Sequence, residues 1–442
     1  MSLCNIRVSS VPRTSYNIMT LRWLKHTLSR RSRRTTAPEP HNPFTLEGLR
    51  LSHSLWAHFW FSPRQHFCTV RASWETVDGG GWNGYTLWPF IIAIEALLEA
   101  EAASPGSFTQ QIHASLNALE KFRSRSLKHA YCAWLWFEGN NDVYYDDNAQ
   151  VAIAFLRAYS LPSTRRHSYL SSATSITSWL LTGWDSRGGM RWHISKPDAR
   201  NACTTNLSAI AALKLAAVGG EWIGPRPLLE FAERCAEWVW TELREGSGLI
   251  KDGAGGGPTW TYNTGAAIYT QVLLWQANGR EGHKERARQL AEVSCDRGKG
   301  LFDGSNPCVQ ERYWWDSMFF MQLLVEGLVE FSCALEEVYP DMARKAGEEV
   351  KRHMLYIMKY MKGREDGLYV RNLRMYVVSV KHVEMYRTLT GDIGRKPELD
   401  ESERWGDAES LKLPVEKRGV CKTLLGNGGA ARSLLIAGRL QQ

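Results

Sequence analysis

The feature that most restricts the fold of this chain is an alternation of two helical patterns, repeated roughly every 50 to 65 residues. Helices of the first kind are amphipathic with a charged face, which can be exposed to water. Helices of the second kind are apolar nearly all round, so they must be covered on every side. The first kind is expected at residues 107–125, 227–245, 282–298 and 341–361, and the second at residues 88–100, 149–159, 207–218, 264–275 and 318–331.

The connections between these helices also alternate. The chain passes from a charged helix to an apolar one through a long loop rich in Gly, Trp, Tyr, Asn and Asp, and returns through a short turn. Five such units are clear, and a sixth is expected to run from 341–361 through an irregular region to 422–440. Six outer–inner pairs close into a double ring, so the pattern predicts an all-α fold, an (α/α)6 barrel. All the long loops then gather at one end and enclose a concave site.

The charge of the chain is concentrated in its first residues. Of the 54 basic residues, eight lie in residues 1–38, which hold no acid, so the other 46 balance the 46 acidic residues. A body that binds nucleic acid is expected to carry its own basic stripe. We therefore expect a basic segment without a fold at 1–43, one domain at 44–442, and no nucleic-acid partner.

Several other classes of protein are disfavoured by what the sequence lacks. The basic segment has no apolar stretch typical of a secretory signal, and no run of about 18 apolar residues predicts a membrane span. The nine cysteines form no CxxC pair or zinc spacing, so no metal or other cofactor is expected. We expect a monomer, and the compartment stays open.

The segment Val143–Tyr159, "VYYDDNAQVAIAFLRAY", places two adjacent aspartates at the head of an apolar helix. Like charges repel, but the unpaired N–H groups at a helix start stabilise negative charge. Capping would require only one of them. Two carboxyls are also the minimum equipment of a glycosidase, and a retaining enzyme needs them about 5 to 5.5 Å apart, which neighbouring residues can reach. The residues alone leave both capping and catalysis open for Asp146 and Asp147.

The long loops concentrate side chains that suit sugars. Nine of the 19 tryptophans lie in or beside these loops, mixed with Asn, Asp, Arg and Tyr. Aromatic rings can stack on the C–H faces of a pyranose, and polar groups can bind its hydroxyls. This clustering favours a carbohydrate-binding groove, although many tryptophans are expected to serve only as core.

Four ordered blocks of the chain resemble glycoside hydrolase family 76, the endo-α-1,6-mannanase family of bacteria and fungi. The block "YYDDNAQVAIAFLRAY" is similar to the Tyr-Asp-Asp-Asn-Ala-Trp motif of that family. The other three blocks are "GYTLWPFIIAIEALLEA" (84–100), "GGMRWHISKPDARNACTTNLSAIAALKL" (188–215) and "WTYNTGAAIYTQVLLW" (260–275). The likeness spans roughly residues 44 to 440.

This resemblance implies an (α/α)6 barrel that hydrolyses α-1,6-mannosidic bonds with retention, with α-mannan as partner. It implies that Asp146 is the nucleophile and Asp147 the general acid/base. Expected substrate contacts lie in the loops and helix starts: Trp82, Trp88, Tyr145, Trp192, Arg200, Asn201, Asn206, Trp260, Tyr262, Asn263, Trp315 and Asp316. The polar members of this set are about as easily explained as helix caps, and for Asp316 capping is favoured.

The chain also departs from the family. Gln150 stands where the family usually has Trp, and no secretory signal is visible. A transglycosylase acting on cell-wall mannan or glycolipid anchors, as in a fungal branch of the family, is one alternative. A catalytically inactive carbohydrate-binding relative is another. A sugar epimerase on the same barrel is a third, but it needs facing histidines, and the expected inner helices contain none.

Overall fold

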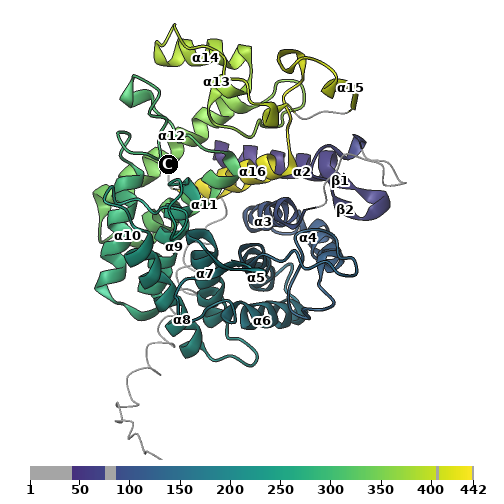
Figure 1. The fold of residues 1–442 in the computed structure, drawn as a ribbon, viewed down its shortest axis with the longest axis vertical. Helices are drawn as coiled ribbons and strands as arrows, with labels where there is room; N and C mark the ends of the chain where they lie inside the picture. The colour runs from purple at the N-terminus through teal and green to yellow at the C-terminus, as the bar shows by residue number, and fades with distance from the viewer. Residues whose placement is uncertain (1–41, 75–85, 405–407, 441–442) are drawn as a thin grey trace, which may run out of the picture.

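The computed structural model describes residues 42–74, 86–404 and 408–440 and consists mostly of helices (Figure 1). Six helices form an outer layer: α2 (Pro43–Phe59), α4 (Thr109–Ala118), α6 (His167–Leu181), α8 (Pro225–Trp238), α10 (Glu281–Ser294) and α12 (Pro340–Tyr356). Six more form an inner layer: α3 (Leu87–Ala103), α5 (Tyr145–Ser160), α7 (Ala202–Val218), α9 (Thr261–Asn278), α11 (Met318–Leu335) and α16 (Leu424–Ala437). The outer and inner helices alternate along the chain.

The inner helices close into a ring. Each packs on the next in chain order, from α3 through α5, α7, α9 and α11 to α16, and α16 packs back on α3. This confirms the predicted (α/α)6 barrel. Because six helices share the ring, α5 and α11 stand on opposite sides of it, a relation that matters for the candidate site.

Not every outer helix has the charged face that was used to predict outer helices from the sequence. Helices α2 and α6 are outer helices that the sequence analysis did not identify, although α8, α10 and α12 lie within or close to their expected ranges. The polar face of α6, "HSYLSSATSITSWLL", consists of Ser, Thr and one His instead of Lys, Arg and Glu. A hydroxyl-rich face can meet water as a charged one does, so this helix is amphipathic without a charge signal.

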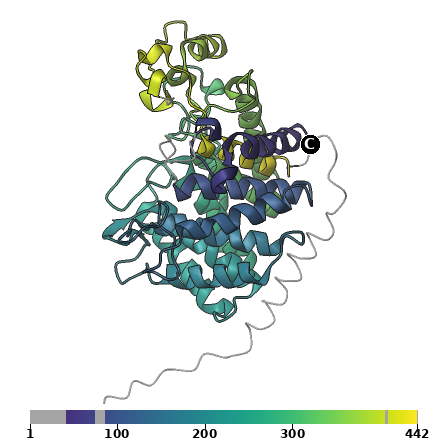
Figure 2. The ribbon, with the colours of Figure 1, turned by 90° about the vertical axis from the view of Figure 1, so that its right-hand side faces the viewer.

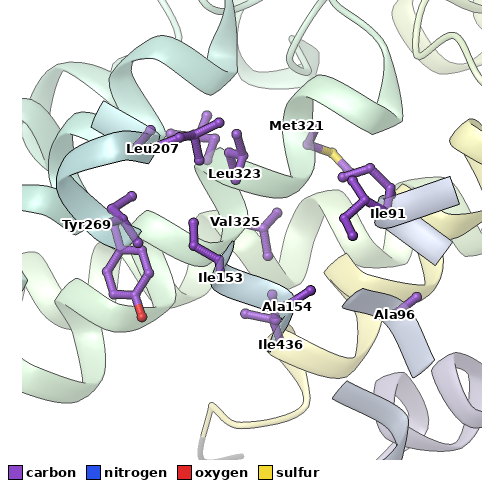
Figure 3. Close-up of a cluster of buried hydrophobic side chains, with 14 of the residues drawn as sticks. Ile91, Ala96, Ile153, Ala154, Leu207, Tyr269, Met321, Leu323, Val325 and Ile436 are labelled. Atoms are coloured by element: carbon purple, nitrogen blue, oxygen red, sulfur yellow. The ribbon is translucent and has the colours of Figure 1, made fainter. Parts of the chain in front are cut away.

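The hydrophobic core fills the space within and around the inner ring (Figure 3). Labelled side chains there come from all six inner helices: Ile91, Ile153, Leu207, Tyr269, Met321 and Ile436. Helix α11 is long and apolar enough to cross a membrane, but 78% of it is buried, as expected for a core helix of the barrel.

The inner ring also contains buried charges, which the predominantly apolar pattern did not predict. The guanidinium of Arg432 on α16 is 3.0 Å from Glu95 of α3 and 2.6 Å from Glu326 of α11, and it also donates to Gln322. Buried charges are tolerated when they are paired and hydrogen-bonded in this way. The network therefore joins three inner helices.

The long loops lie at one end of the barrel, and the end of α16 lies at the other (Figure 2). Two loops contain short hairpins, formed by β1 (Trp60–Phe61) with β2 (His66–Phe67) and by β3 (Arg191–His193) with β4 (Lys196–Arg200). The last loop is enlarged into a lobe with the short helices α13 (Met375–Val378), α14 (Val380–Thr390) and α15 (Ala408–Leu411). This lobe stands beside the barrel in both views (Figures 1 and 2).

Hydrogen bonds from the inner helices link the loops to one another. The first N–H of a helix has no acceptor within the helix, so it needs one outside. In five inner helices that N–H donates to the loop before the next helix of the ring. The bonds are Leu87 N to Ala133 O, Ala202 N to Asp252 O, Thr261 N to Asp316 Oδ2, Met318 N to Arg371 O, and Leu424 N to Thr69 O, at 2.8–2.9 Å.

A second contact fixes four of the loops to the helices that follow them. The fourth residue of α5, Asn148, accepts from Tyr131 N at 2.7 Å, and the fourth residue of α16, Asn427, accepts from Tyr369 N at 2.7 Å. Thr205 of α7 and Thr264 of α9 accept from loop N–H groups in the same way. The loop end is thus a bonded ring and forms a rigid support for a site.

The close approach of α9 and α11 generates a stability prediction. A Cβ placed on Gly265 would lie 2.4 Å from the backbone of Leu324, and one on Gly327 would lie 2.3 Å from Gly265 O. We expect Gly265→Ala to lower the free energy of unfolding by about 1–3 kcal/mol or more, because the two backbones must separate. Urea unfolding followed by tryptophan fluorescence measures this difference.

The matched control is Gly282→Ala on the outer helix α10, where a Cβ meets open space. That change is expected to be neutral or to stabilise by up to about 1 kcal/mol, as alanine favours helix. Equal stability of the Gly265→Ala variant and the native protein would contradict the tight packing of these helices.

Candidate active site

The floor of the loop end is built from one position of each inner helix. The second residue of every inner helix is partly exposed, whereas most residues that follow the first turn are buried. These six residues are Trp88, Asp146, Cys203, Tyr262, Phe319 and Leu425. Helix geometry therefore selects which side chains are exposed at the loop end, and Asp146 and the following residue Asp147 are among them.

Asp146 is held in place by two hydrogen bonds. Its Oδ2 accepts from Trp192 Nε1 at 3.0 Å, and its Oδ1 accepts from the backbone N–H of Asp147 at 3.0 Å. Trp192 lies on β3 and is itself flanked by the Tyr144 ring at 5.0 Å and by the Lys196 ammonium 5.1 Å from its ring centre. The indole, predicted as a substrate contact, thus also orients a carboxyl.

The two carboxyls have unequal environments. Burial raises the pKa of Asp146 to about 6, while its two hydrogen-bond donors favour the ionised form. Burial raises the pKa of Asp147 well above its ordinary value, and the neighbouring charges of Asp146 and Asp142 raise it further. Hydrogen-bond donors therefore favour the ionised form of Asp146, whereas burial and the neighbouring negative charges favour the protonated form of Asp147.

A third carboxyl, Asp252, which the sequence did not single out, acts electrostatically on Asp146. Asp252 accepts hydrogen bonds from Tyr262 Oη at 2.7 Å and from Asn263 Nδ2 at 3.1 Å. Its charge also contributes to the raised pKa of Asp146. The only sequence signal was an Asp in a Gly-rich loop, which is typical of a turn. The structure places the predicted residues Tyr262 and Asn263 around it.

The opposite side of the floor is aromatic. The ring of Phe320 on α11 lies 4.5 Å from Tyr262, 5.2 Å from Trp260 and 5.9 Å from Trp88. Trp315 lies 4.7 Å from Trp260. Three predicted aromatic contacts thus pack on a phenylalanine that the sequence pattern had assigned to a core helix, and the fourth, Trp315, packs on Trp260. The site has an acidic half around α5 and an aromatic half around α11.

Several predicted contact residues are engaged elsewhere. Tyr145 is only 4% exposed and stacks on Trp179 of the outer helix α6 at 4.3 Å, so the prediction that it contacts substrate does not agree with its position. The buried Arg200 donates to Asp185 at 2.6 Å and to the carbonyl of Gly189 at 2.6 Å. Its guanidinium therefore holds the loop around β3 and β4 together.

The two predicted asparagines at the start of α7 act within that helix. Asn201 Oδ1 accepts from Thr204 N at 2.9 Å, which is an N-cap, and the buried Asn206 donates to Ala202 O at 3.0 Å. Gln150, the departure from the family motif, is buried on α5. The predicted contact Trp82 lies outside the described residues.

Asp316 is 3% exposed and caps a neighbouring helix. Its Oδ2 accepts from Thr261 N at 2.8 Å and from Thr261 Oγ1 at 2.7 Å, both at the start of α9. Burial raises the pKa of this carboxyl to about 7. Within the described ranges no group of His, Cys, Asp and Glu has the arrangement of a metal site.

Comparisons with known proteins show the family of this chain. A family model described as glycosyl hydrolase family 76 matches residues 63–379. A protein of Schizosaccharomyces pombe described as "Meiotically up-regulated gene 191 protein" is 31% identical over 378 residues, which cover 80% of this chain and 84% of that protein.

Solved structures show the same fold at lower identity. One is an inactive variant, with two consecutive aspartates changed to asparagine, of an α-1,6-mannanase from Salegentibacter sp. HEL1_6 in complex with α-1,6-mannotriose. It is 18% identical with a TM-score of 0.64, covering 90% of this chain and 100% of that one. A family 76 glycoside hydrolase (mannosidase) from Bacteroides thetaiotaomicron VPI-5482 is 16% identical with a TM-score of 0.64, covering 90% and 98%.

The raised pKa values of the pair predict a stability effect. An acid whose pKa is higher in the folded than in the unfolded state destabilises the fold once the pH exceeds the unfolded value, and the penalty vanishes as the pH falls below it. We therefore expect Asp147→Asn to stabilise the protein by about 1–3 kcal/mol at about pH 8, and by much less at about pH 4.5.

Chemical unfolding at the two pH values measures this difference. The control is Asp198→Asn, which removes a carboxyl that is 87% exposed and is expected to change stability little at either pH. A stabilisation by Asp147→Asn that did not depend on pH would rule out the raised pKa.

Proposed function

The chain belongs to glycosyl hydrolase family 76, and on this premise we propose that it hydrolyses α-1,6-mannosidic bonds of mannan with retention of configuration. The observation that carries the proposal is the unequal pair of carboxyls at the start of α5. A retaining glycosidase needs one ionised carboxylate and one protonated carboxyl side by side. Asp146, with two hydrogen-bond donors, suits the first role, and Asp147 suits the second.

The reaction would proceed in two displacements. In the first, Asp146 attacks the anomeric carbon while Asp147 donates its proton to the departing glycosidic oxygen, which gives a glycosyl ester on Asp146. In the second, the ionised Asp147 takes a proton from water, the hydroxyl attacks the anomeric carbon, and the ester bond to Asp146 breaks. Both carboxyls return to their starting state, and the product keeps the configuration of the substrate.

The choice of substrate rests on the relatives and on the two halves of the floor. The mannanase from Salegentibacter is described as binding α-1,6-mannotriose, and its inactive variant lacks two consecutive aspartates. The aromatic half offers rings for the C–H faces of sugars beside the reacting one, and the acidic half offers Asp252 to hydroxyls. An α-1,6-linked mannan chain fits both features.

Two alternatives share this site but differ in the fate of the bound sugar. A transglycosylase would pass the glycosyl group to a sugar hydroxyl instead of water, and an inactive relative would bind mannan without turning it over. A sugar epimerase is disfavoured, because none of the six inner helices contains the histidines that such chemistry needs.

The first test is incubation with unbranched α-1,6-mannan, followed by measurement of reducing ends and chromatography of the products. We expect short manno-oligosaccharides, and we expect Asp146→Asn and Asp147→Asn each to lower turnover by at least about 10³-fold, as loss of either partner blocks a displacement. Circular dichroism checks that the variants fold. Longer products without new reducing ends would favour transfer, and binding without products would favour an inactive relative.

The hydrogen bond from Trp192 predicts a change in pH dependence. Trp192→Phe removes a donor to Asp146, so the pKa of Asp146 should rise. The acidic limb of the kcat/KM profile should then move to higher pH, and the plateau should fall about tenfold with the loss of orientation. Trp184→Phe, in the same loop but packed near Phe231, is the control and should leave the limb in place. An unchanged limb in Trp192→Phe would contradict this role.

A further inference from the structure

The start of α9 differs from the starts of the other inner helices. In α3, α7, α11 and α16, the first N–H donates to a backbone carbonyl of the next loop. In α9 the acceptor is a side chain, the carboxyl of Asp316, which also accepts from the hydroxyl of Thr261. A backbone carbonyl is present whatever the residue, but this contact depends on one aspartate.

The first turn of α9 carries the groups that fix Asp252. Tyr262 and Asn263, directly after Thr261, donate to the same oxygen, Asp252 Oδ1. The backbone carbonyl of Asp252 in turn accepts from Ala202 N at the start of α7. Asp252 is therefore held between two inner helices, and its side chain is held by α9 alone among the contacts described.

Asp316 itself is firmly placed. Its carbonyl accepts from Leu373 N at 3.4 Å, and the next residue, Ser317, pairs with Asn372 of the last loop. Its second oxygen, Oδ1, is buried and makes no hydrogen bond in the part of the chain that the structure describes. The positively charged group that bears on this carboxyl is Arg374. The carboxyl is thus directed at α9, with nothing else competing for Oδ2.

We propose that Asp316 is a positioning residue of the active site, which holds Asp252 opposite Asp146 by capping α9. This inference rests on the proposed function for its kinetic test. Asp316 does not touch the reacting atoms. It acts through Thr261 on Tyr262 and Asn263, and through these on Asp252.

The position of Asp252 affects the pKa of Asp146, and this effect can be measured. The groups that interact with Asp146 through hydrogen bonds or charge are Asp147 on the same helix, Trp192 of β3, Cys203 of α7, Tyr262 of α9, Tyr144 and Asp252. The negative charge of Asp252 opposes the ionisation of Asp146. When Asp252 moves away or is neutralised, Asp146 should ionise at lower pH.

The experiment compares kcat/KM profiles on α-1,6-mannan across pH. We expect Asp316→Ala to lower the plateau about tenfold or more, since misplaced site groups cost rate, and to move the acidic limb to lower pH. Asp252→Asn should move the limb in the same direction. The double variant should show no further shift beyond Asp252→Asn. Asp316→Asn should restore both plateau and limb, because its amide oxygen can still accept from Thr261.

Two further variants separate positioning from folding. Asp303→Ala removes a carboxyl of the same loop that bonds Ser305 instead of α9, and it should leave the limb in place. If Asp316→Ala does not fold, Thr261→Val removes the hydroxyl contact alone and should give a smaller limb shift in the same direction. A lower plateau with the limb unmoved in Asp316→Ala, or full activity, would overturn the proposal.

A readout without turnover keeps this inference separate from the proposed function. Asp146→Asn should stabilise the protein at about pH 8, and less so in an Asp316→Ala background, because the pKa of Asp146 is then less raised. An equal stabilisation in both backgrounds would overturn the positioning role, whether or not mannan is cleaved. If mannan is not cleaved but the stabilisation differs, only the proposed function fails.

Discussion

The structure depends on how the first N–H groups of the inner helices find acceptors. A helix start leaves donors unpaired, and in this barrel five of them point at the loop that precedes the next helix. Each of these five loops is thus covalently continuous with one inner helix and hydrogen-bonded to another. Because the inner helices pack in a ring, these hydrogen bonds link neighbouring loops around the same ring. The long irregular loops are thereby held in place and can support a site.

The same helix starts decide which residues can act. Only the first turn of each inner helix reaches the open end, so the floor receives one or two side chains from each helix. On α5 these are two carboxyls, on α9 a tyrosine and on α11 two phenylalanines. Since α5 and α11 stand across the ring, the carboxyls and the aromatic surface face each other.

The carboxyls at the loop end lower the stability of the fold, although they suit a catalytic site. Three acids, Asp146, Asp147 and Asp252, lie close together with few positive groups, which raises the pKa of the first two. A fold selected for stability alone would not gather these charges. The protein tolerates them because Trp192, Tyr262 and Asn263 donate hydrogen bonds to two of the three, while burial favours the protonated form of the third.

Much of this could be predicted from the sequence, because the helical period records which face of each segment is buried. The repeat of outer and inner helices predicted the double ring, and that ring placed Asp146 and Asp147 at a helix start beneath the loops. The period did not identify α6, because its exposed face is built from hydroxyls. It also assigned Phe319 and Phe320 to the core, because a partly exposed ring at a helix start has the same sequence pattern as a buried one.

What only the tertiary structure decided is the identity of partners that are distant in sequence. Asp252 looked like a turn residue until α9 brought Tyr262 and Asn263 to it, and Asp316 looked like a cap of its own helix but caps α9. Tyr145 and Arg200 carry sugar-binding chemistry, yet one is stacked on α6 and the other pairs with Asp185. The sequence by itself determined the barrel and the location of its catalytic candidates, since periodicity is a local property. The direction and partner of each side chain arise from packing between segments, and no local pattern encodes them.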